Sequence, residues 1–380
     1  MQVIRFGIIG CGLMGREFAS AAARWCHLTD IAARPEIVAV CNRTAAKMDW
    51  FTAHFPTIRQ ATTDYRELLA NDEVDAVYCA VPHNLHEETY CAVIESGKHL
   101  FGEKPFGIDR AAYDAIAACL RRHPRVFTRC CSQFPFFPGV QRIGSMIEQG
   151  AFGRIIEVEA GFLHSSDLNP AKPINWKRQI KTNGEYGVMG DLGMHICHVP
   201  LRAGWRPRNV RAILSNIVPV RPDGKGGMAP CETWDNATLL CEAEDAAGER
   251  FPLTLKTQRI APGETNTWFL RILGTQAAAE FTTRRPTLLR LLEYQNGRQD
   301  WRELDLGYET AFPTITGGIF EFGFGDAILQ MWASYVDELH RGAPRGRFSG
   351  TATVEEVGLS HQLFTAALRS QREQATVPVE

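Results

Sequence analysis

The sequence has no run of apolar residues approaching the roughly 20 that a membrane-spanning helix needs. Its first residues, MQVIRFGIIGCG, lack the pattern of a cleavable signal peptide. Positive and negative side chains nearly balance, and the formal net charge is -2. Such a charge gives no reason to expect nucleic acid or an anionic membrane as a partner. We therefore expect a cytoplasmic protein that binds neither.

Cysteine pairs with metal-ligand spacing are also missing. The chain has 11 cysteines in 380 residues, but the C-x-x-C pattern that usually announces a zinc site does not occur. The number is odd, and many cysteines lie in apolar segments, such as Cys41 in IVAVCN and Cys79 in AVYCAVP. We therefore expect no metal site, and buried reduced thiols rather than a disulfide framework.

The order of apolar segments predicts an α/β fold in two parts. Up to about residue 128, short β-rich runs such as VIRFGIIG alternate with helix-like segments such as REFASAAARW, which predicts a doubly wound parallel sheet. Between residues 208 and 310, strand-like segments follow one another with little helix, which predicts a large, open, mainly antiparallel sheet. Two amphipathic helices are expected near the C-terminus. The expected domains are residues 1–128 and 129–380.

The first candidate site is a glycine-rich turn. Gly10, Gly12 and Gly15 have the G-x-G-x-x-G spacing between a predicted strand and a predicted helix. The first glycine permits a tight turn, the second lets a pyrophosphate approach the backbone, and the third lets the helix pack on the strand. The turn therefore predicts dinucleotide binding. At the end of the second strand, Asn42 and Arg43 stand where an NAD site usually offers an acidic residue, so NADP stays open as an alternative to NAD.

The second candidate is Lys104 in HLFGEKPFGI. In a doubly wound sheet the carboxyl ends of the strands line the ligand crevice, so an ammonium there would stabilise a developing alkoxide. The alternative is an ordinary surface pair of Glu103 and Lys104. Farther on, Asp191 and His195 are four residues apart in GDLGMHICH, which on a helix puts both on one face. His198 in the same segment is expected to be a packed histidine.

These motifs together resemble the Gfo/Idh/MocA oxidoreductases, named for glucose-fructose oxidoreductase and inositol dehydrogenase. The resemblance rests on the glycine motif, on VPHNLHEETYCAVIESGKHLFGEKP and on GDLGMHICH. It implies a Rossmann domain, then an α/β domain whose open sheet often serves oligomerisation. It also implies that Lys104, Asp191 and His195 form the catalytic set. Two departures from the family pattern are Asn42 and His198, because many members have acidic residues there.

The resemblance implies NAD as cofactor, with a carbohydrate substrate and a homodimer or homotetramer formed through the C-terminal sheet. The expected cofactor contacts are Gly10, Gly12, Leu13, Met14, Gly15, Asn42, Arg43, Pro82, His83, His86, Glu103 and Lys104. Besides Asp191 and His195, the expected substrate contacts are Trp176, which would stack on a pyranose, and Lys177 and Arg178, which would meet an anionic substituent. A solvated basic loop is the alternative for these three residues.

Two functions follow from the same residues. In the first, His195 takes a hydroxyl proton and Lys104 stabilises the alkoxide while a hydride passes from a sugar, glycoside or cyclitol carbinol to the nicotinamide. In the second, the same oxidation is transient, and it allows elimination and hydrolysis of a glycoside without net consumption of the cofactor. The basic segment NWKRQIK would suit an acidic sugar as the substrate. The sequence does not decide between these two functions.

Overall fold

The computed structural model describes residues 1–380, which form two compact units. Unit 1 comprises residues 1–107, 111–136 and 310–354, and unit 2 comprises residues 108–110, 137–309 and 355–380. The segment 310–354 therefore packs with the N-terminal part, although the expected division assigned it to the second domain. The expectation that residues 1–128 bind the cofactor and residues 129–380 bind the substrate stays a prediction. None of the helices combines the length and apolar character needed to cross a lipid bilayer.

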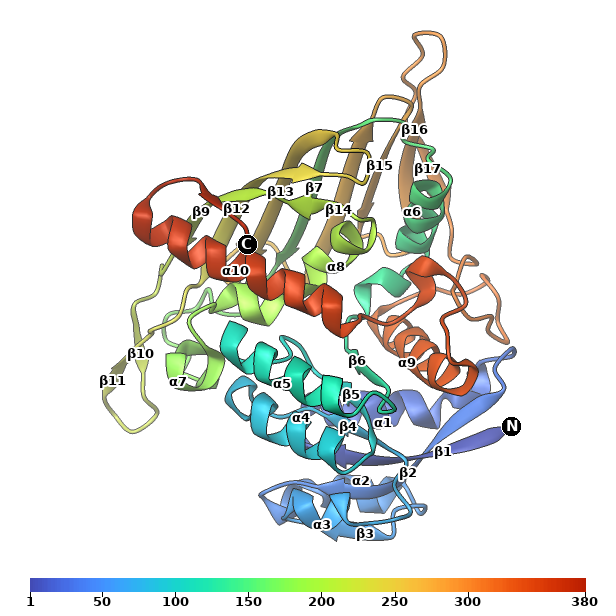
Figure 1. The fold of residues 1–380 in the computed structure, drawn as a ribbon, viewed down its shortest axis with the longest axis vertical. Helices are drawn as coiled ribbons and strands as arrows, with labels where there is room; N and C mark the ends of the chain where they lie inside the picture. The colour runs from blue at the N-terminus through green and yellow to red at the C-terminus, as the bar shows by residue number, and fades with distance from the viewer. The chain divides into compact units, whose positions relative to one another are not determined.

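Unit 1 contains a parallel sheet of six strands in the order β3-β2-β1-β4-β5-β6 (Figure 1). The strand order reverses between β1 and β4, which in doubly wound sheets is where ligands bind. The sequence prediction of a doubly wound sheet is confirmed. Its strands are β1 Gln2–Ile9, β2 Ala33–Cys41, β3 Gln60–Thr62, β4 Ala76–Cys79, β5 His99–Gly102 and β6 Thr128–Cys130. Its helices are α1 Leu13–Ala23, α2 Asp49–His54, α3 Tyr65–Leu69, α4 His86–Glu95, α5 Arg110–Arg122 and α9 Phe324–Arg341.

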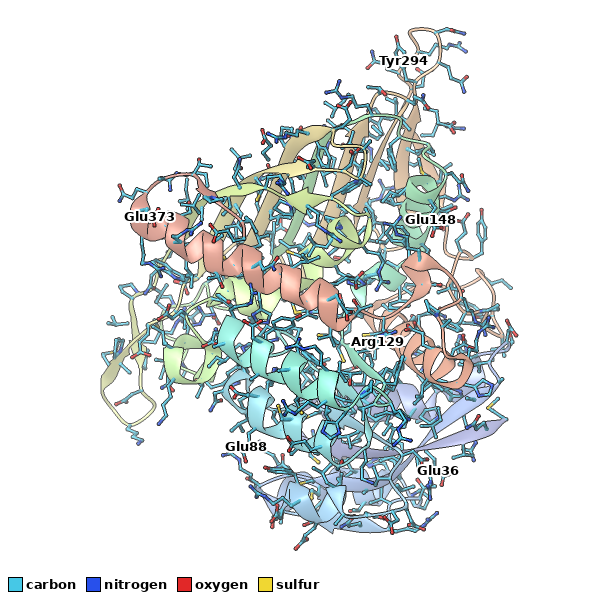
Figure 2. All side chains as sticks on the ribbon, viewed as in Figure 1. Glu36, Glu88, Arg129, Glu148, Tyr294 and Glu373 are labelled. Carbon is cyan, nitrogen blue, oxygen red and sulfur yellow. The ribbon has the colours of Figure 1, made fainter.

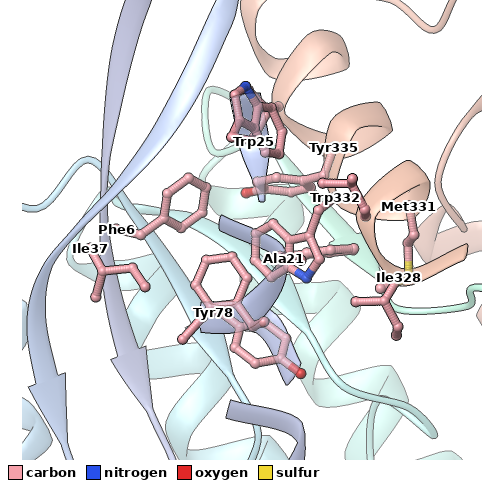
Figure 3. Close-up of a cluster of buried hydrophobic side chains, with 14 of the residues drawn as sticks. Phe6, Ala21, Trp25, Ile37, Tyr78, Ile328, Met331, Trp332 and Tyr335 are labelled. Carbon is pink, nitrogen blue, oxygen red and sulfur yellow. The ribbon is translucent and has the colours of Figure 1, made fainter. Parts of the chain in front are cut away.

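The core of unit 1 explains why α9 belongs to it. The Trp332 ring of α9 is stacked on Phe18 of α1 and meets Phe6 of β1 edge-on, with ring centroids 5.4 Å apart (Figure 3). Aromatic rings bury large apolar areas, so this contact fixes α9 against the sheet. Arg129 of β6, labelled in Figure 2, forms an ion pair with Glu338 of α9 at 3.0 Å.

Unit 2 is built on a sheet of ten strands, ordered β17-β16-β15-β14-β7-β13-β12-β9-β18, with β8 paired to β12. All its pairings are antiparallel except that of β7 with β13, so the mainly antiparallel sheet is confirmed. Helices α6, α8 and α10 lie over one face of this sheet (Figure 1). The strands are β7 Ile155–Leu163, β8 Arg206–Pro207, β9 Asn209–Ser215, β12 Asn236–Glu244, β13 Arg250–Gln258, β14 Thr267–Gly274, β15 Ala277–Thr282, β16 Leu288–Glu293, β17 Arg302–Asp305 and β18 Val377–Pro378.

The remaining elements of unit 2 connect or cover this sheet. These elements include two short helical turns, and a π-helical turn that runs directly into α8. The helical elements are α6 Pro138–Glu148, a 3-10 turn Trp176–Arg178, α7 Ile180–Asn183, the π-helical turn Met189–Gly193, α8 Met194–Arg202 and α10 Val354–Glu373. A separate hairpin is formed by β10 Val220–Pro222 and β11 Met228–Pro230.

Candidate functional site

The three glycines of the first turn are required for different physical reasons. Gly10 has φ +105°, and a Cβ there would lie 2.3 Å from the carbonyl oxygen of Ala80. A Cβ on Gly15 would lie 2.4 Å from the carbonyl oxygen of Gly10. A Cβ on Gly12 would meet nothing within 4 Å. Gly10 and Gly15 thus allow the turn to pack, whereas Gly12 leaves open space beside the start of α1.

That open space fits a dinucleotide phosphate. No side chain caps the amides at the start of α1, and the helix dipole places partial positive charge there. Leu13 is 73% exposed and Met14 is half-buried. The side-chain oxygen of Asn42 accepts a hydrogen bond from the Cys11 amide at 3.2 Å, while Arg43 is exposed. Asn42 therefore stabilises the glycine turn through this hydrogen bond. Neither Asn42 nor Arg43 supplies a carboxylate at the end of β2.

The turn after β4 carries three further predicted contacts. Pro82 is half-buried, and His83 is buried at the start of the turn. The His86 ring is fully buried and stacks on Tyr90. Its Nδ1 accepts from the Gly107 amide at 3.3 Å, so Nε2–H donates to the Val81 carbonyl at 3.1 Å. His86 thus ties the segment after Lys104 to this turn, and direct contact with the cofactor stays a prediction for all three.

Lys104 follows Glu103, the first residue after β5, and Glu103 is fixed in the interior. The Glu103 side chain accepts a hydrogen bond from Tyr78 at 2.7 Å, and its carbonyl accepts one from Tyr90 at 2.7 Å. Burial raises the pKa of the Glu103 carboxyl. A buried, hydrogen-bonded Glu103 does not form a solvated surface pair, which removes the alternative raised for this motif. The half-buried Lys104 is held at the carboxyl end of its strand.

In unit 2, Asp191 and His195 lie on one continuous helical segment, but not on one α-helix as expected. Asp191 belongs to the π-helical turn, whose wider winding changes which faces its residues share, and His195 belongs to α8. Both are buried, with exposed fractions of 2% and 5%. The His195 ring meets Phe162 edge-on at 5.6 Å, and its carbonyl accepts a hydrogen bond from the Trp268 indole at 2.9 Å. The sheet therefore fixes the position of His195.

Two cations hold the carboxylate of Asp191. The Lys177 ammonium lies 3.0 Å from each of its oxygens, and the Arg259 guanidinium forms a second, buried ion pair with it. Burial lowers the pKa of Arg259 to about 10, so the guanidinium is still charged at neutral pH. Trp176, the residue before Lys177, is 36% exposed. The structure thus brings Lys177 to Asp191 as well as to Trp176.

Arg178 does not fit its expected role as a substrate contact. Its side chain is 2% exposed and forms ion pairs with Asp167 at 2.5 Å and Asp235 at 2.8 Å. Asp235 also accepts hydrogen bonds from the amides of Ile217 and Val218. The buried charge of Arg178 requires these two partners. Arg178 therefore connects the loop that contains Lys177 with the sheet of unit 2.

His198 is a packed histidine, in agreement with the sequence interpretation. Its Nδ1 lies 3.3 Å from the carboxylate of Glu356, which also pairs with Arg202. Burial, together with the neighbouring Arg202, lowers the pKa of His198 to about 3, although Glu356 opposes the shift. A neutral imidazole with so low a pKa is a poor proton acceptor, so His195 is the better candidate base.

Comparison with known proteins agrees with this geometry. Residues 4–129 match the model of an oxidoreductase family with an NAD-binding Rossmann fold, and residues 140–280 match the Gfo/Idh/MocA C-terminal domain. Levoglucosan dehydrogenase of Pseudarthrobacter phenanthrenivorans is 26% identical over 346 residues, which cover 86% of this chain and 83% of that protein. A glycosyl hydrolase family 109 protein of a Shewanella species is 29% identical over 174 residues, which cover 43% of this chain and 36% of that protein.

Solved structures show the same fold along the whole chain. Levoglucosan dehydrogenase in complex with NADH and L-sorbose has a TM-score of 0.88 at 22% identity, and each chain is covered in full. An oxidoreductase domain protein from Kribbella flavida has a TM-score of 0.89 at 21% identity, again with full coverage of both chains. Since both parts of the chain match their domain models, the chain belongs to the Gfo/Idh/MocA oxidoreductase family and contains its NAD-binding Rossmann fold.

Proposed function

We propose that this protein is an NAD-dependent dehydrogenase that oxidises a carbinol of a sugar, glycoside or cyclitol. The observation that carries the proposal is the buried segment with Asp191 and His195, in which two cations hold the carboxylate and the sheet fixes the histidine. The levoglucosan dehydrogenase that resembles it over most of its length supports the substrate class. The glycine turn and the uncapped amides at the start of α1 support dinucleotide binding.

In the proposed reaction His195 removes the hydroxyl proton, since imidazole is the side chain that most often serves as a general base. Lys104 supplies an ammonium that stabilises the alkoxide as it forms. Asp191, held by Lys177 and Arg259, orients the substrate hydroxyl. Bound NAD supplies the hydride acceptor. Glu103 acts by fixing the place of Lys104.

A second candidate is redox-neutral glycoside hydrolysis. It is favoured by the relatives named as family 109 glycosyl hydrolases, which match less than half of this chain. The same proton transfers and the same alkoxide stabilisation serve a transient oxidation, so the site residues do not separate the two functions.

One experiment separates them. The purified protein is incubated with NAD and chromogenic glycosides, free sugars and levoglucosan, and reduced nicotinamide and released aglycone are followed together. Reduced nicotinamide formed in step with oxidised sugar supports the dehydrogenase. Aglycone released with catalytic amounts of NAD and no net reduction supports the hydrolase. Neither product with any member of the panel would contradict both.

The open face of the unit 2 sheet supports a homodimer or homotetramer. Phe162 and Trp268 point toward α8, so strand alternation puts Phe269 on the opposite face. That face has a depression of about 380 Å³ lined in part by Phe269 and Leu288, and Ile213 and Leu240 are 60% and 53% exposed. We expect Ile213→Lys with Leu240→Lys to reduce the mass measured by light scattering to that of a smaller assembly. An unchanged mass would contradict assembly through this face.

A further inference from the structure

The carboxyl group of Glu103 lies in the interior of unit 1, in the residue directly before Lys104. Glu103 is 7% exposed, although an ionised carboxylate is costly to bury without partners. The Tyr78 hydroxyl donates to this carboxyl at 2.7 Å, and the Tyr90 hydroxyl donates to the Glu103 carbonyl at 2.7 Å. The Glu103 amide donates to the Cys79 carbonyl at 3.0 Å. Both the backbone and the side chain of Glu103 are therefore fixed.

The hydroxyl that binds the carboxyl is rigidly placed by the core. The Tyr78 ring lies 4.9 Å from the Phe18 ring and 5.1 Å from the Trp332 ring (Figure 3). A tyrosine hydroxyl has one proton to donate, and the Met14 carbonyl, at 3.5 Å, is too distant to compete with the carboxyl at 2.7 Å. The core of unit 1 thus directs a hydrogen-bond donor at the Glu103 side chain.

Neutral side chains face this carboxyl from β4, from α4 and from the residue after β6. Burial raises the pKa of each of them, so they carry no charge at neutral pH: Tyr78, Cys79, Tyr90 and Cys131. The His86 ring, stacked on Tyr90, is neutral as well, because its Nδ1 accepts a hydrogen bond from an amide. None of these groups supplies a positive charge to the carboxyl.

Lys104 supplies that positive charge. Burial raises the pKa of the Glu103 carboxyl, whereas the Lys104 ammonium lowers it. Hydrogen bonds from Tyr78, from the Lys104 amide and from the Cys131 thiol act in the same direction as the ammonium. The interaction between two opposite charges is mutual, so the carboxylate favours the charged form of the lysine. This matters because Lys104 is itself half-buried, and burial alone favours an uncharged amine.

We propose that the Glu103 carboxylate is the counter-ion that keeps the Lys104 ammonium protonated while an alkoxide forms beside it. Glu103 acts through Lys104 and is in this respect a positioning residue. The proposal rests on the role given to Lys104 in the proposed function, and it adds what maintains the charge of that lysine. An amine that had lost its proton would not stabilise an alkoxide, so turnover would fall wherever the lysine is uncharged.

The first test measures how readily Lys104 loses its proton, and it needs no substrate. Trace acetic anhydride, which reacts with the uncharged amine, is added across a pH series, and mass spectrometry gives the acetylation of the Lys104 peptide. In the wild type, the pH of half-maximal reactivity should be no lower than for Lys104 in the urea-unfolded chain. Half-burial without a counter-ion would lower it, so a lower value in the folded protein would overturn the proposal.

Three variants separate the charge of Glu103 from its packing. Glu103→Gln keeps an acceptor for Tyr78 but removes the charge, so at about pH 8 Lys104 should be acetylated about tenfold faster than in the wild type. Glu103→Asp keeps the charge and should restore most of the wild-type rate. Glu87→Gln removes an exposed carboxylate of α4 and should leave the rate unchanged. Equal rates in Glu103→Gln and the wild type, or in Glu103→Gln and Glu103→Asp, would overturn the proposal.

Turnover tells failure of this inference from failure of the proposed function. The alkaline limb of kcat/KM with NAD should move to lower pH in Glu103→Gln and stay in place in Glu87→Gln. NADH binding, measured by fluorescence, checks that each variant is folded. Wild-type turnover with a Lys104 reactivity that does not respond to Glu103→Gln would overturn the inference and leave the proposed function standing. No turnover of any carbinol would contradict the proposed function, while the acetylation still decides whether Glu103 is the counter-ion.

Discussion

Arg259 forms a buried ion pair with Asp191, four residues before His195 in the chain. The arginine follows β13, and the aspartate lies in the π-helical turn before α8. The ion pair therefore connects the sheet of unit 2 to the segment that carries the proposed base. Together with Lys177, it fixes the carboxylate where a substrate hydroxyl is expected to bind.

Removal of this arginine is expected to cost stability. Arg259→Met leaves Asp191 with Lys177 but without its buried partner, so the free energy of unfolding should fall by about 3 kcal/mol, as for other broken buried pairs. The measurement is urea unfolding followed by circular dichroism. The double variant Arg259→Met with Asp191→Asn should recover part of the loss, because no buried carboxylate is left without its arginine. A single variant as stable as the wild type would contradict the buried pair.

Lys104 is an expected contact of the cofactor, but we expect its ammonium to matter far more for turnover than for cofactor binding. Lys104→Met should lower kcat/KM by roughly 10²- to 10⁴-fold, because it removes the ammonium that stabilises the alkoxide. The dissociation constant for NADH, measured by fluorescence, should change little. Lys98→Met is the control: Lys98 donates to the carbonyls of Asn71 and Val74, so its loss should lower stability without lowering turnover per folded molecule. Equal turnover in Lys104→Met and wild type would remove Lys104 from the mechanism.

The roles of the second and third glycines of the turn are separable by alanine substitution. Gly12→Ala adds a Cβ that meets no protein atom, so the melting temperature should stay the same while NADH binding weakens about tenfold or more. Gly15→Ala forces its Cβ against the Gly10 carbonyl, so both the melting temperature and NADH binding should fall. Thermal unfolding with and without NADH measures both quantities. Undiminished NADH binding by Gly12→Ala would show that the phosphate does not approach the turn at this residue.

His198 is expected to make stability depend on pH in the acid range. Its pKa is about 3 in the folded protein and ordinary, near 6.5, in the unfolded chain, so below pH 6.5 the unfolded chain binds a proton that the folded protein does not. Stability therefore falls as the pH drops from about 6.5 toward 3, by up to roughly 1.4 kcal/mol per pH unit from this one group. His198→Gln keeps a donor for Glu356 and should flatten this dependence in urea unfolding at pH 7, 6 and 5. Parallel pH curves for variant and wild type would contradict the shifted pKa.

Much of the fold was predictable because it rests on local patterns. Alternating apolar strands and helices predicted the parallel sheet, and the succession of strand-like segments with little helix after residue 208 predicted the antiparallel one. The glycine motif was recognisable from the sequence. Its tight turn, its approach to a pyrophosphate and its packing of helix on strand require Gly10, Gly12 and Gly15 at this spacing. Lys104 was found because a charged residue directly after an apolar strand is conspicuous.

The remaining features depend on contacts between residues far apart in the sequence. Arg259 was missed because an arginine at the end of a strand has no pattern of its own, and its role comes only from meeting Asp191. Arg178 was expected to meet an anionic group of the substrate, because a basic run such as NWKRQIK does not show that Asp167 and Asp235 enclose one of its members. The packing of α9 in unit 1 comes from Trp332, whose partners Phe6 and Phe18 are more than 300 residues away along the chain.

The central claim is that a hydride passes from a carbinol carbon to the nicotinamide. The most direct test uses the best substrate of the panel, labelled with deuterium at that carbon, together with unlabelled NAD. Mass spectrometry of the cofactor, isolated within a single turnover, shows where the label goes. The account predicts deuterium on the nicotinamide ring, and loss of this transfer in Lys104→Met and in His195→Ala. Product formed while the cofactor stays unlabelled would contradict it.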